Sequence, residues 1–295
     1  MNLSLLKLSV SKTKLGVIWF LAHCVIFSLL SALLKLYAGD YHMFQIVFLQ
    51  NIIGLCLILP FANKKEFYVK GLKNLKLHFA RSSLWIISII LYTYILTQIS
   101  LAKVIAICFT EPLLISLFAV LLLKEKMRKD KLLAMLFGFI GVLVVVQPGM
   151  EGFEPSSLLM LPVVVLWAIS GIIVKKISVK EDLITQLLYM LVISNIITLP
   201  LALLKWQSLD LSSFVGFTAI AALFVLNSAT MSRSFKYADL TILMPYSFSQ
   251  LIFVAIIDFV LFNIIIDFYT ISGALIIVAS LTIWPCCKKI MSLFQ

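Results

Sequence analysis

Long apolar runs, separated by short polar connections, follow one another along the whole chain. A helix needs about 20 residues to cross the hydrocarbon core of a bilayer. Ten runs meet this length: residues 15–37, 41–62, 79–98, 101–123, 131–147, 156–174, 183–204, 213–232, 241–266 and 268–287. Lipid offers no hydrogen-bond partner to backbone N–H and C=O groups, so each run must be helical. The pattern therefore predicts an all-α polytopic membrane protein with ten transmembrane helices.

The chain repeats itself at an offset of 140 residues. Three pairs of positions at this offset carry similar residues: Phe27 and Trp167, Lys35 and Lys175, and Pro60 and Pro200. Further along, the offset falls to 136, so the second half has lost about four residues between spans. The halves, 15–147 and 156–287, hold five spans each, and an odd number of crossings inverts one half relative to the other. Two inverted five-helix repeats of this kind place a substrate site near the bilayer midplane, where the repeats meet.

Composition leaves little room for a soluble domain. Hydrophobic residues make up 62% of the 295 and charged residues 13%, and the mean hydropathy is +1.12. The longest connection, 63–78, is too short for a catalytic or nucleotide-hydrolysing domain, and no phosphate-binding, metalloprotease or serine-hydrolase motif occurs. The five cysteines lack metal-ligand spacing. We therefore expect a protein that is not an enzyme and needs no cofactor and no metal.

Positive charge is distributed unevenly over the connections. If the N-terminus is cytoplasmic, all of the 24 basic residues lie on the cytoplasmic side except Lys35, Lys103 and Lys205. Cytoplasmic loops of membrane proteins collect Lys and Arg in this way. We therefore expect both termini to be cytoplasmic. The net charge of +11 is interpreted as a topology signal, and we expect no nucleic-acid partner.

Charge interrupts the predicted span 101–123 at Lys103 and at Glu111, which Pro112 follows directly. A charged side chain in the middle of a membrane helix costs about 2.5–3.5 kcal/mol on insertion scales, and such residues usually face a cavity or a partner. Pro112 removes a backbone donor and kinks the helix. A carboxylate at such a bend is suited to bind a cationic group or a proton. The alternative is that Glu111 is protonated, or pairs structurally with a basic residue of a neighbouring span.

One face of the predicted helix 79–98 carries aromatic and hydroxyl groups. Four residues follow one another at helical spacing: Arg81, Trp85, Ser88 and Tyr92. At about 100° per residue they form a stripe roughly 60° wide. Trp and Tyr rings are suited to stack on a flat ligand or to hold a cation. Packing or interface anchoring is the alternative, and Arg81 then only marks the inner boundary of the span.

A second polar group follows a proline in the predicted span 241–266. Tyr246 and Gln250 come after Pro245 and lie opposite Glu111 in the repeat alignment. The pseudo-symmetry makes them the natural second wall of a central site. Pro245 is expected to kink its helix.

Other polar or small residues within spans are less specific. Asp258 is either a second titratable group of the site or a residue that reaches outward to solvent. His23, a lone histidine in the first span, is interpreted as hydrogen-bonded packing. Gly138 and Gly273 occupy corresponding spans and permit close helix approach.

The chain resembles the drug/metabolite transporter superfamily, in particular its ten-helix members with paired EamA domains. Four stretches carry the resemblance: FTEPLLISLFAVLLLKEKM and GFIGVLVVVQPG in the first half, and LMPYSFSQLIFVAIIDFVLF and SGALIIVASL in the second. The P-Y-S-x-x-Q stretch that starts at Pro245 is similar to bacterial members that take up S-adenosylmethionine. The resemblance implies a multi-pass protein of the bacterial inner membrane that works by alternating access.

We therefore expect a secondary transporter of a small organic metabolite, with S-adenosylmethionine uptake as the specific hypothesis. Its partners would be the small-molecule substrate and the lipid bilayer. Export of amino acids or drugs is the alternative within the superfamily. Another class is an intramembrane enzyme that uses Glu111 and Asp258, and a third is a passive pore or a structural membrane protein. The sequence leaves open whether the protein is a monomer or a homodimer.

Overall fold

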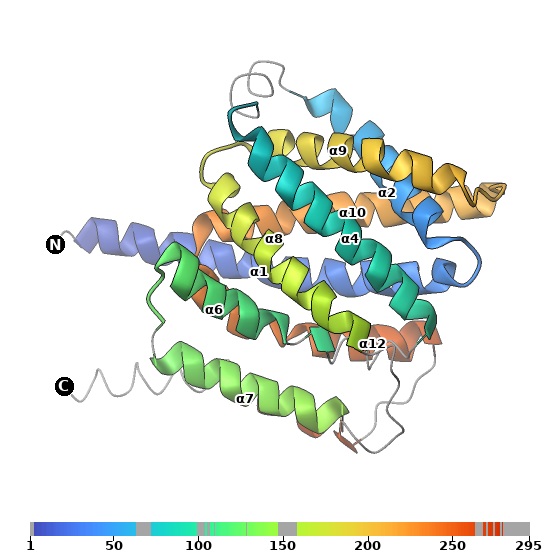
Figure 1. The fold of residues 1–295 in the computed structure, drawn as a ribbon. Helices are drawn as coiled ribbons and strands as arrows, with labels where there is room; N and C mark the ends of the chain where they lie inside the picture. Colours follow the sequence, from blue (N-terminus) through green and yellow to red (C-terminus); the bar gives the residue numbers. More distant parts are fainter. Residues whose placement is uncertain are drawn as a thin grey trace.

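The computed structural model describes residues 3–62, 72–98, 104, 107–108, 110–127, 129–146, 158–262, 268–269, 271–273, 275–277 and 279. In these ranges the regular elements are all helical, and there is no strand (Figure 1). The α-helices are α1 (Leu3–Ala38), α2 (Met43–Ile58), α4 (Leu75–Gln98), α6 (Glu111–Leu123), α7 (Lys129–Val146), α8 (Met160–Ser178), α9 (Leu183–Leu203), α10 (Leu211–Tyr237), α11 (Leu240–Ser247) and α12 (Gln250–Phe262). Two short 3-10 helices are η1 (Leu59–Phe61) and η3 (Leu72–Asn74).

Many of these helices have the length and composition of membrane spans. Within the described ranges, seven segments qualify: Lys12–Ala38, Met43–Phe61, Leu72–Gln98, Met160–Ser178, Leu183–Leu203, Leu211–Tyr237 and Leu240–Ile257. Two shorter apolar helices, Glu111–Leu123 and Leu132–Gly141, fall within the predicted spans 101–123 and 131–147. The predicted span 268–287 lies mostly outside the described residues. The prediction of an all-helical protein with many spans is confirmed for the part of the chain that the structure describes.

The 140-residue offset of the sequence reappears in the helix boundaries. α1 ends at Ala38 and α8 at Ser178, whereas α2 begins at Met43 and α9 at Leu183. Backbone hydrogen bonds of the two intervening turns also fall at equivalent positions. The first two helices of each half are therefore built to the same plan.

Side chains at equivalent positions start the second helix of each half. His42 Nδ1 accepts a hydrogen bond from the N–H of Phe44 at 3.3 Å, and the Asp182 carboxylate accepts one from the N–H of Thr185 at 3.0 Å. Such caps satisfy backbone donors that have no partner within the helix. Both turns are thus specified by local sequence.

The two halves pack so that the first helix of each half contacts the third helix of the other half. α1 packs on α10, and its counterpart α8 packs on α4. α2 packs on α9, α6 lies against α8, and α11 and α12 lie against α1. The α1–α2 turn lies at the right of Figure 1 and the α8–α9 turn at the left, so α1 and α8 run in opposite directions. Reciprocal contacts between oppositely directed helices are what a twofold relation between inverted halves produces.

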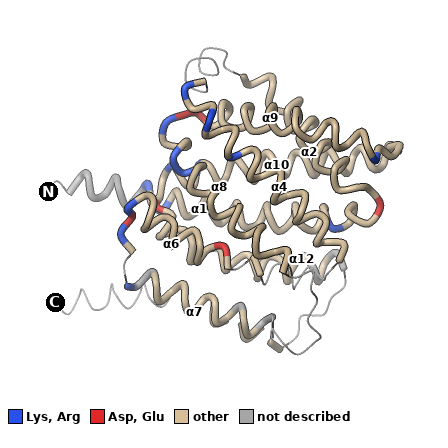
Figure 2. Tube along the Cα trace, viewed as in Figure 1, with Lys and Arg blue, Asp and Glu red and all other residues tan. Residues whose placement is uncertain are grey.

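Basic side chains gather at one end of this helix bundle. Figure 2 shows Lys and Arg concentrated at the left-hand end of the described helices, with few at the right. Lys35 in the last turn of α1 and Lys205 just after α9 belong to the opposite end. This is the charge asymmetry expected between the two faces of a membrane protein.

Candidate functional site

A cavity lies where the two halves meet. α1, α2, α4 and α6 line it from the first half, and α8 to α12 line it from the second. Its empty volume is about 1070 Å³, including the open mouth. Small-molecule sites are concave and combine apolar walls with a few polar groups. The cavity between the two halves has this character.

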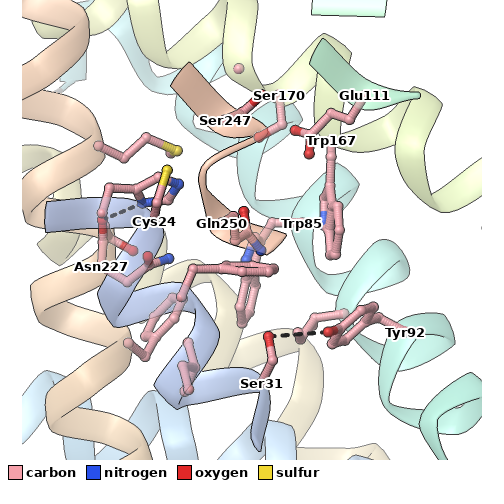
Figure 3. A pocket seen from close by; sticks show the side chains of 18 of the residues that line it. Cys24, Ser31, Trp85, Tyr92, Glu111, Trp167, Ser170, Asn227, Ser247 and Gln250 are labelled. Atoms are coloured by element: carbon pink, nitrogen blue, oxygen red, sulfur yellow. Dashed lines mark hydrogen bonds between the residues drawn. The ribbon is translucent and has the colours of Figure 1, made fainter. Parts of the chain in front are cut away.

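Glu111 lines this cavity at an interruption in its helix (Figure 3). The N–H of Thr110 donates to the carbonyl of Ile107 at 3.0 Å in a turn, and α6 begins at Glu111 with Pro112 in its first turn. Proline is well tolerated there, because the first N–H groups of a helix have no partner within it. The amino-terminal end of a helix also favours negative charge. Among the described residues, no basic side chain forms an ion pair with Glu111.

The corresponding helix of the second half is also interrupted at the cavity. α11 contains Pro245 and ends at Ser247, and α12 starts at Gln250. Ser247 and Gln250 both line the cavity (Figure 3). Ser247 lies 136 residues beyond Glu111, which is the offset found for this part of the repeat. Broken helices that meet at a repeat interface are the usual framework of a transporter binding site.

Aromatic rings form two groups on the cavity lining, which together are called the aromatic wall here. The Trp167 ring lies 5.1 Å from that of Tyr92 and 6.0 Å from that of Phe27, centroid to centroid. On the same lining, the rings of Trp85 and Phe224 lie 4.9 Å apart. These separations are typical of favourable aromatic pairs. The wall presents ring faces and edges on which a flat ligand or a cation is able to settle.

Several polar lining atoms have no partner within the described protein. Both amide atoms of Gln50, Oδ1 of Asn227 and Nη1 of Arg81 are buried without a hydrogen bond among the described residues. Buried polar groups are nearly always hydrogen-bonded to protein, water or ligand. The polar lining is thus suited to bind a polar ligand or ordered water.

A buried hydrogen-bond network lies at the basic end of the bundle. The Glu181 carboxylate accepts from Asn74 Nδ2 at 2.6 Å and pairs with His78 Nε2 at 2.8 Å. Gln186 Nε2 donates to the Glu181 carbonyl at 3.1 Å, and Gln186 Oε1 accepts from the Ser232 hydroxyl at 2.8 Å. The network ties the start of α4 to the α8–α9 turn, to α9 and to α10.

The other end of the bundle has an analogous network. Gln45 Nε2 donates to the Gln207 carbonyl at 2.8 Å, and the Gln207 N–H donates back to Gln45 Oε1 at 2.9 Å. The Tyr41 hydroxyl donates to the Ser213 hydroxyl at 2.7 Å. Hydrogen bonds from Ser213 also lower the pKa of the Asp210 carboxyl at the start of α10. Each turn between the first two helices of one half is therefore bonded to the start of the third helix of the other.

The structure brings together some of the predicted site residues. Trp85, Tyr92, Glu111, Pro112 and Gln250 all line the cavity. They come from α4 and α6 of the first half and from α12 of the second half.

Other predicted site residues lie elsewhere. Ser88 is buried off the cavity, and its hydroxyl donates to the Trp85 carbonyl at 2.8 Å. Tyr246 does not line the cavity, although its carbonyl accepts from the Cys24 thiol at 4.0 Å. Pro245 is buried within α11. The side chain of Asp258, on α12, lies outside the described residues.

Most lining residues were not predicted from the sequence, among them Gln50, Trp167 and Asn227. Gln50 and Asn227 are amides within apolar spans, a pattern that marks polar sites in membranes. Trp167 was visible only as the repeat partner of Phe27. His23 has the expected packing contact, with Nδ1 3.3 Å from the Asn227 carbonyl oxygen, and it also lines the cavity.

Comparison with known proteins identifies the architecture. The sequence profile of the EamA-like transporter family matches twice, at residues 14–147 and 155–284. The S-adenosylmethionine uptake transporter of Rickettsia prowazekii is 30% identical over 94% of this chain and 95% of that protein. The riboflavin transporter of Brucella anthropi is 28% identical over 80% of this chain and 86% of that protein.

A more distant relative matches by sequence, and a solved structure matches in its fold. The pseudopaline exporter CntI of Pseudomonas aeruginosa is 21% identical over 90% of this chain and 94% of that protein. A solved crystal structure matches with a TM-score of 0.73 and 16% identity, over 93% of this chain and 97% of that chain. With its repeated profile match and its central cavity between two halves, the chain belongs to the EamA-like transporter family.

Proposed function

We propose that this protein takes up S-adenosylmethionine across the inner membrane of a bacterium by alternating access. The observation that carries the proposal is the juxtaposition, in one cavity, of the Glu111 carboxylate and an aromatic wall that includes Trp167 and Tyr92. Full-length similarity to transporters named for S-adenosylmethionine uptake supports the same substrate.

The chemistry of the ligand fits this lining. S-adenosylmethionine carries a flat adenine, a permanently cationic sulfonium, and an amino acid group with an ammonium and a carboxylate. Adenine stacks on aromatic side chains, which contributes about 1–3 kcal/mol per base. A cationic centre is stabilised by a carboxylate and by ring faces. Glu111, without a basic partner among the described residues, is free to supply that carboxylate.

The proposal includes the complete topology. Ten spans form two inverted five-helix repeats, residues 15–147 and 156–287, and both termini lie in the cytoplasm. The basic end of the bundle then faces the cytoplasm, in agreement with the charge asymmetry of membrane proteins. Exchange of conformation between the two halves opens the cavity to one side and then to the other. The networks around Glu181 and Gln45, at opposite ends, are suited to break in alternation.

Transport of labelled S-adenosylmethionine into proteoliposomes tests the proposal. We expect saturable uptake by the wild type and at least a tenfold loss in Glu111→Gln, because the amide keeps the shape and removes the charge. Asp40→Asn is the matched control, since Asp40 is an exposed carboxylate in the α1–α2 turn. Uptake by Glu111→Gln equal to that of the wild type would remove Glu111 from the mechanism. Absence of uptake by the wild type would refute the proposal that S-adenosylmethionine is the substrate.

Riboflavin is the second candidate, because relatives named as riboflavin transporters also align with most of the chain. Its flat ring system suits the aromatic wall, but it has no cationic centre to engage Glu111. Unlabelled riboflavin is therefore added as a competitor in the same assay. We expect it to leave S-adenosylmethionine uptake unchanged, whereas strong competition together with riboflavin uptake would favour the second candidate.

A further inference from the structure

Arg81 brings a buried cation with a free donor to the cavity lining. Its side chain is 2% exposed, and Nη1 has no hydrogen-bond acceptor among the described residues. Glu181 is its acidic neighbour. Both carboxylate oxygens of Glu181 are already engaged, one by Asn74 and the other by His78. A buried guanidinium needs a further acceptor, and Arg81 lines the cavity from which one is able to reach it.

The two charges that line the cavity do not neutralise each other. Arg81 and Glu111 form no ion pair, although both are described and both line the same space. They belong to α4 and α6, and α8 packs against both of these helices (Figure 1). Trp167 of α8 lines the cavity together with them. The cavity therefore offers a cationic wall and an anionic wall with an aromatic ring on the helix between them.

A neutral amide adds to the polar lining that α2 and α4 contribute. Both side-chain atoms of Gln50 are buried without a partner among the described residues, and Gln50 lines the cavity. Its helix, α2, packs against α4. An amide of this kind accepts and donates hydrogen bonds, so it suits the amino acid part of a ligand, which has both kinds of group.

From these positions we infer that Arg81, assisted by Gln50, binds the carboxylate of the substrate, and that Glu111 holds its sulfonium. The inference rests on the proposed function and extends it from the substrate to the way its two charges are recognised. A guanidinium is suited to this role because its planar fork of donors matches a carboxylate in a bidentate arrangement. The substrate carboxylate supplies the acceptor that Nη1 lacks. A ligand with only one of the two charges leaves one wall of the cavity unpaired.

Two analogues of S-adenosylmethionine separate the two walls. The decarboxylated analogue keeps the sulfonium and the ammonium but lacks the carboxylate, whereas S-adenosylhomocysteine keeps the carboxylate and lacks the sulfonium. Each competes with labelled S-adenosylmethionine in proteoliposomes that contain the wild type, Arg81→Gln, Arg81→Lys or Glu111→Gln. Arg233→Gln is the matched control, because Arg233 is exposed and stacks on the Trp19 ring at 4.8 Å instead of lining the cavity.

We expect the wild type and Arg233→Gln to bind S-adenosylmethionine at least tenfold more tightly than the decarboxylated analogue. Arg81→Gln should lose at least tenfold in affinity for S-adenosylmethionine and less than twofold for the decarboxylated analogue, so that the preference disappears. Arg81→Lys should retain part of the preference. Glu111→Gln should keep the preference for the carboxylate and lose the preference over S-adenosylhomocysteine.

The outcomes that overturn the inference differ from those that overturn the proposed function. If Arg81→Gln weakens both ligands equally, Arg81 is only structural. If the wild type binds S-adenosylmethionine no more tightly than the decarboxylated analogue, the inference also fails. This test needs no variant, so it remains decisive even if Arg81→Gln does not fold. In both cases the proposed function, uptake of S-adenosylmethionine, is not contradicted. Absence of wild-type uptake and competition refutes the proposed function and the inference together.

Discussion

The rings of Phe27 and Trp167 meet edge to face, with their centroids 6.0 Å apart, although 140 residues separate them in the chain. They occupy equivalent positions of the two repeats. Two equivalent residues are able to touch each other only close to the axis that relates the halves. Both residues line the cavity, so the axis between the inverted halves passes beside the proposed binding site. A conformational change in either half therefore alters the shape of a site at this place.

Removal of the Trp167 ring should weaken substrate binding. Trp167→Ala is expected to raise the KM for S-adenosylmethionine about 5- to 150-fold, which corresponds to the roughly 1–3 kcal/mol of a stacked base. Trp167→Phe should retain most of the affinity because a ring face remains. Trp206→Ala, at an exposed tryptophan after α9, is the control and should leave the KM unchanged. Equal KM values in Trp167→Ala and the wild type would exclude stacking on this ring.

A side chain at position 138 should prevent close helix packing. A Cβ atom at Gly138 would overlap the ring of Phe248, in the break between α11 and α12. We expect Gly138→Ala to destabilise the protein by about 1–3 kcal/mol, the usual cost of overpacking. Gly39→Ala is the matched control, because nothing lies within 4 Å of a Cβ there. Thermal unfolding in detergent measures both, and equal melting temperatures would contradict the close approach.

The buried pair of His78 and Glu181 should contribute strongly to stability. Removal of one partner of a buried, hydrogen-bonded pair typically costs about 3–5 kcal/mol. We therefore expect Glu181→Ala to lower the melting temperature markedly, and Asp40→Ala, at an exposed carboxylate, to change it little. The double variant His78→Ala/Glu181→Ala should be less destabilised than the sum of the two single changes, because the two residues interact. Strict additivity would show that they act independently.

Single cysteines should report opposite accessibility at the two ends of the bundle. In a background without native cysteines, Lys180→Cys in the α8–α9 turn and Lys73→Cys in η3 should be protected from a membrane-impermeant thiol reagent in whole cells. Lys205→Cys, after α9, should be labelled. Lysis should expose all three positions. Labelling of Lys180→Cys in intact cells would reverse the proposed orientation of the protein.

Much of the fold was predictable because the bilayer constrains sequence directly. The span predicted at 183–204 corresponds to α9, Leu183–Leu203, since apolar length and internal hydrogen bonding together specify a membrane helix. The repeat offset was also visible in sequence and reappears in the ends of α1 and α8. The bend predicted at Glu111 and Pro112 within the span 101–123 corresponds to an interruption at Thr110, after which α6 begins at Glu111. The exact residue at which the helix restarts depends on local backbone geometry, which hydropathy does not show.

The candidate site was predictable only in part. Helical spacing placed Trp85, Ser88 and Tyr92 on one stripe, but the Ser88 hydroxyl bonds to its own helix and does not line the cavity. Which residues of this helical stripe face the cavity depends on where the neighbouring helices pack. Gln50 and Asn227 were recognisable as polar residues in apolar surroundings, yet nothing in their spacing shows that they share a cavity with Glu111.

The sequence by itself determined that the described part of the chain is helical with many membrane-spanning segments, that the chain consists of two related halves, and that a carboxylate interrupts one apolar run. These properties follow from local constraints: hydrophobic length, helix caps and charge. Tertiary structure alone decided that Phe27 meets Trp167 and that Arg81 and Glu111 share a cavity without pairing. The reason is physical. Phe27 and Trp167 meet where α1 and α8 of opposite halves approach each other, and Arg81 and Glu111 are brought to one cavity because α4 and α6 both pack on α8. Such contacts between helices of opposite halves leave no periodic pattern along the chain.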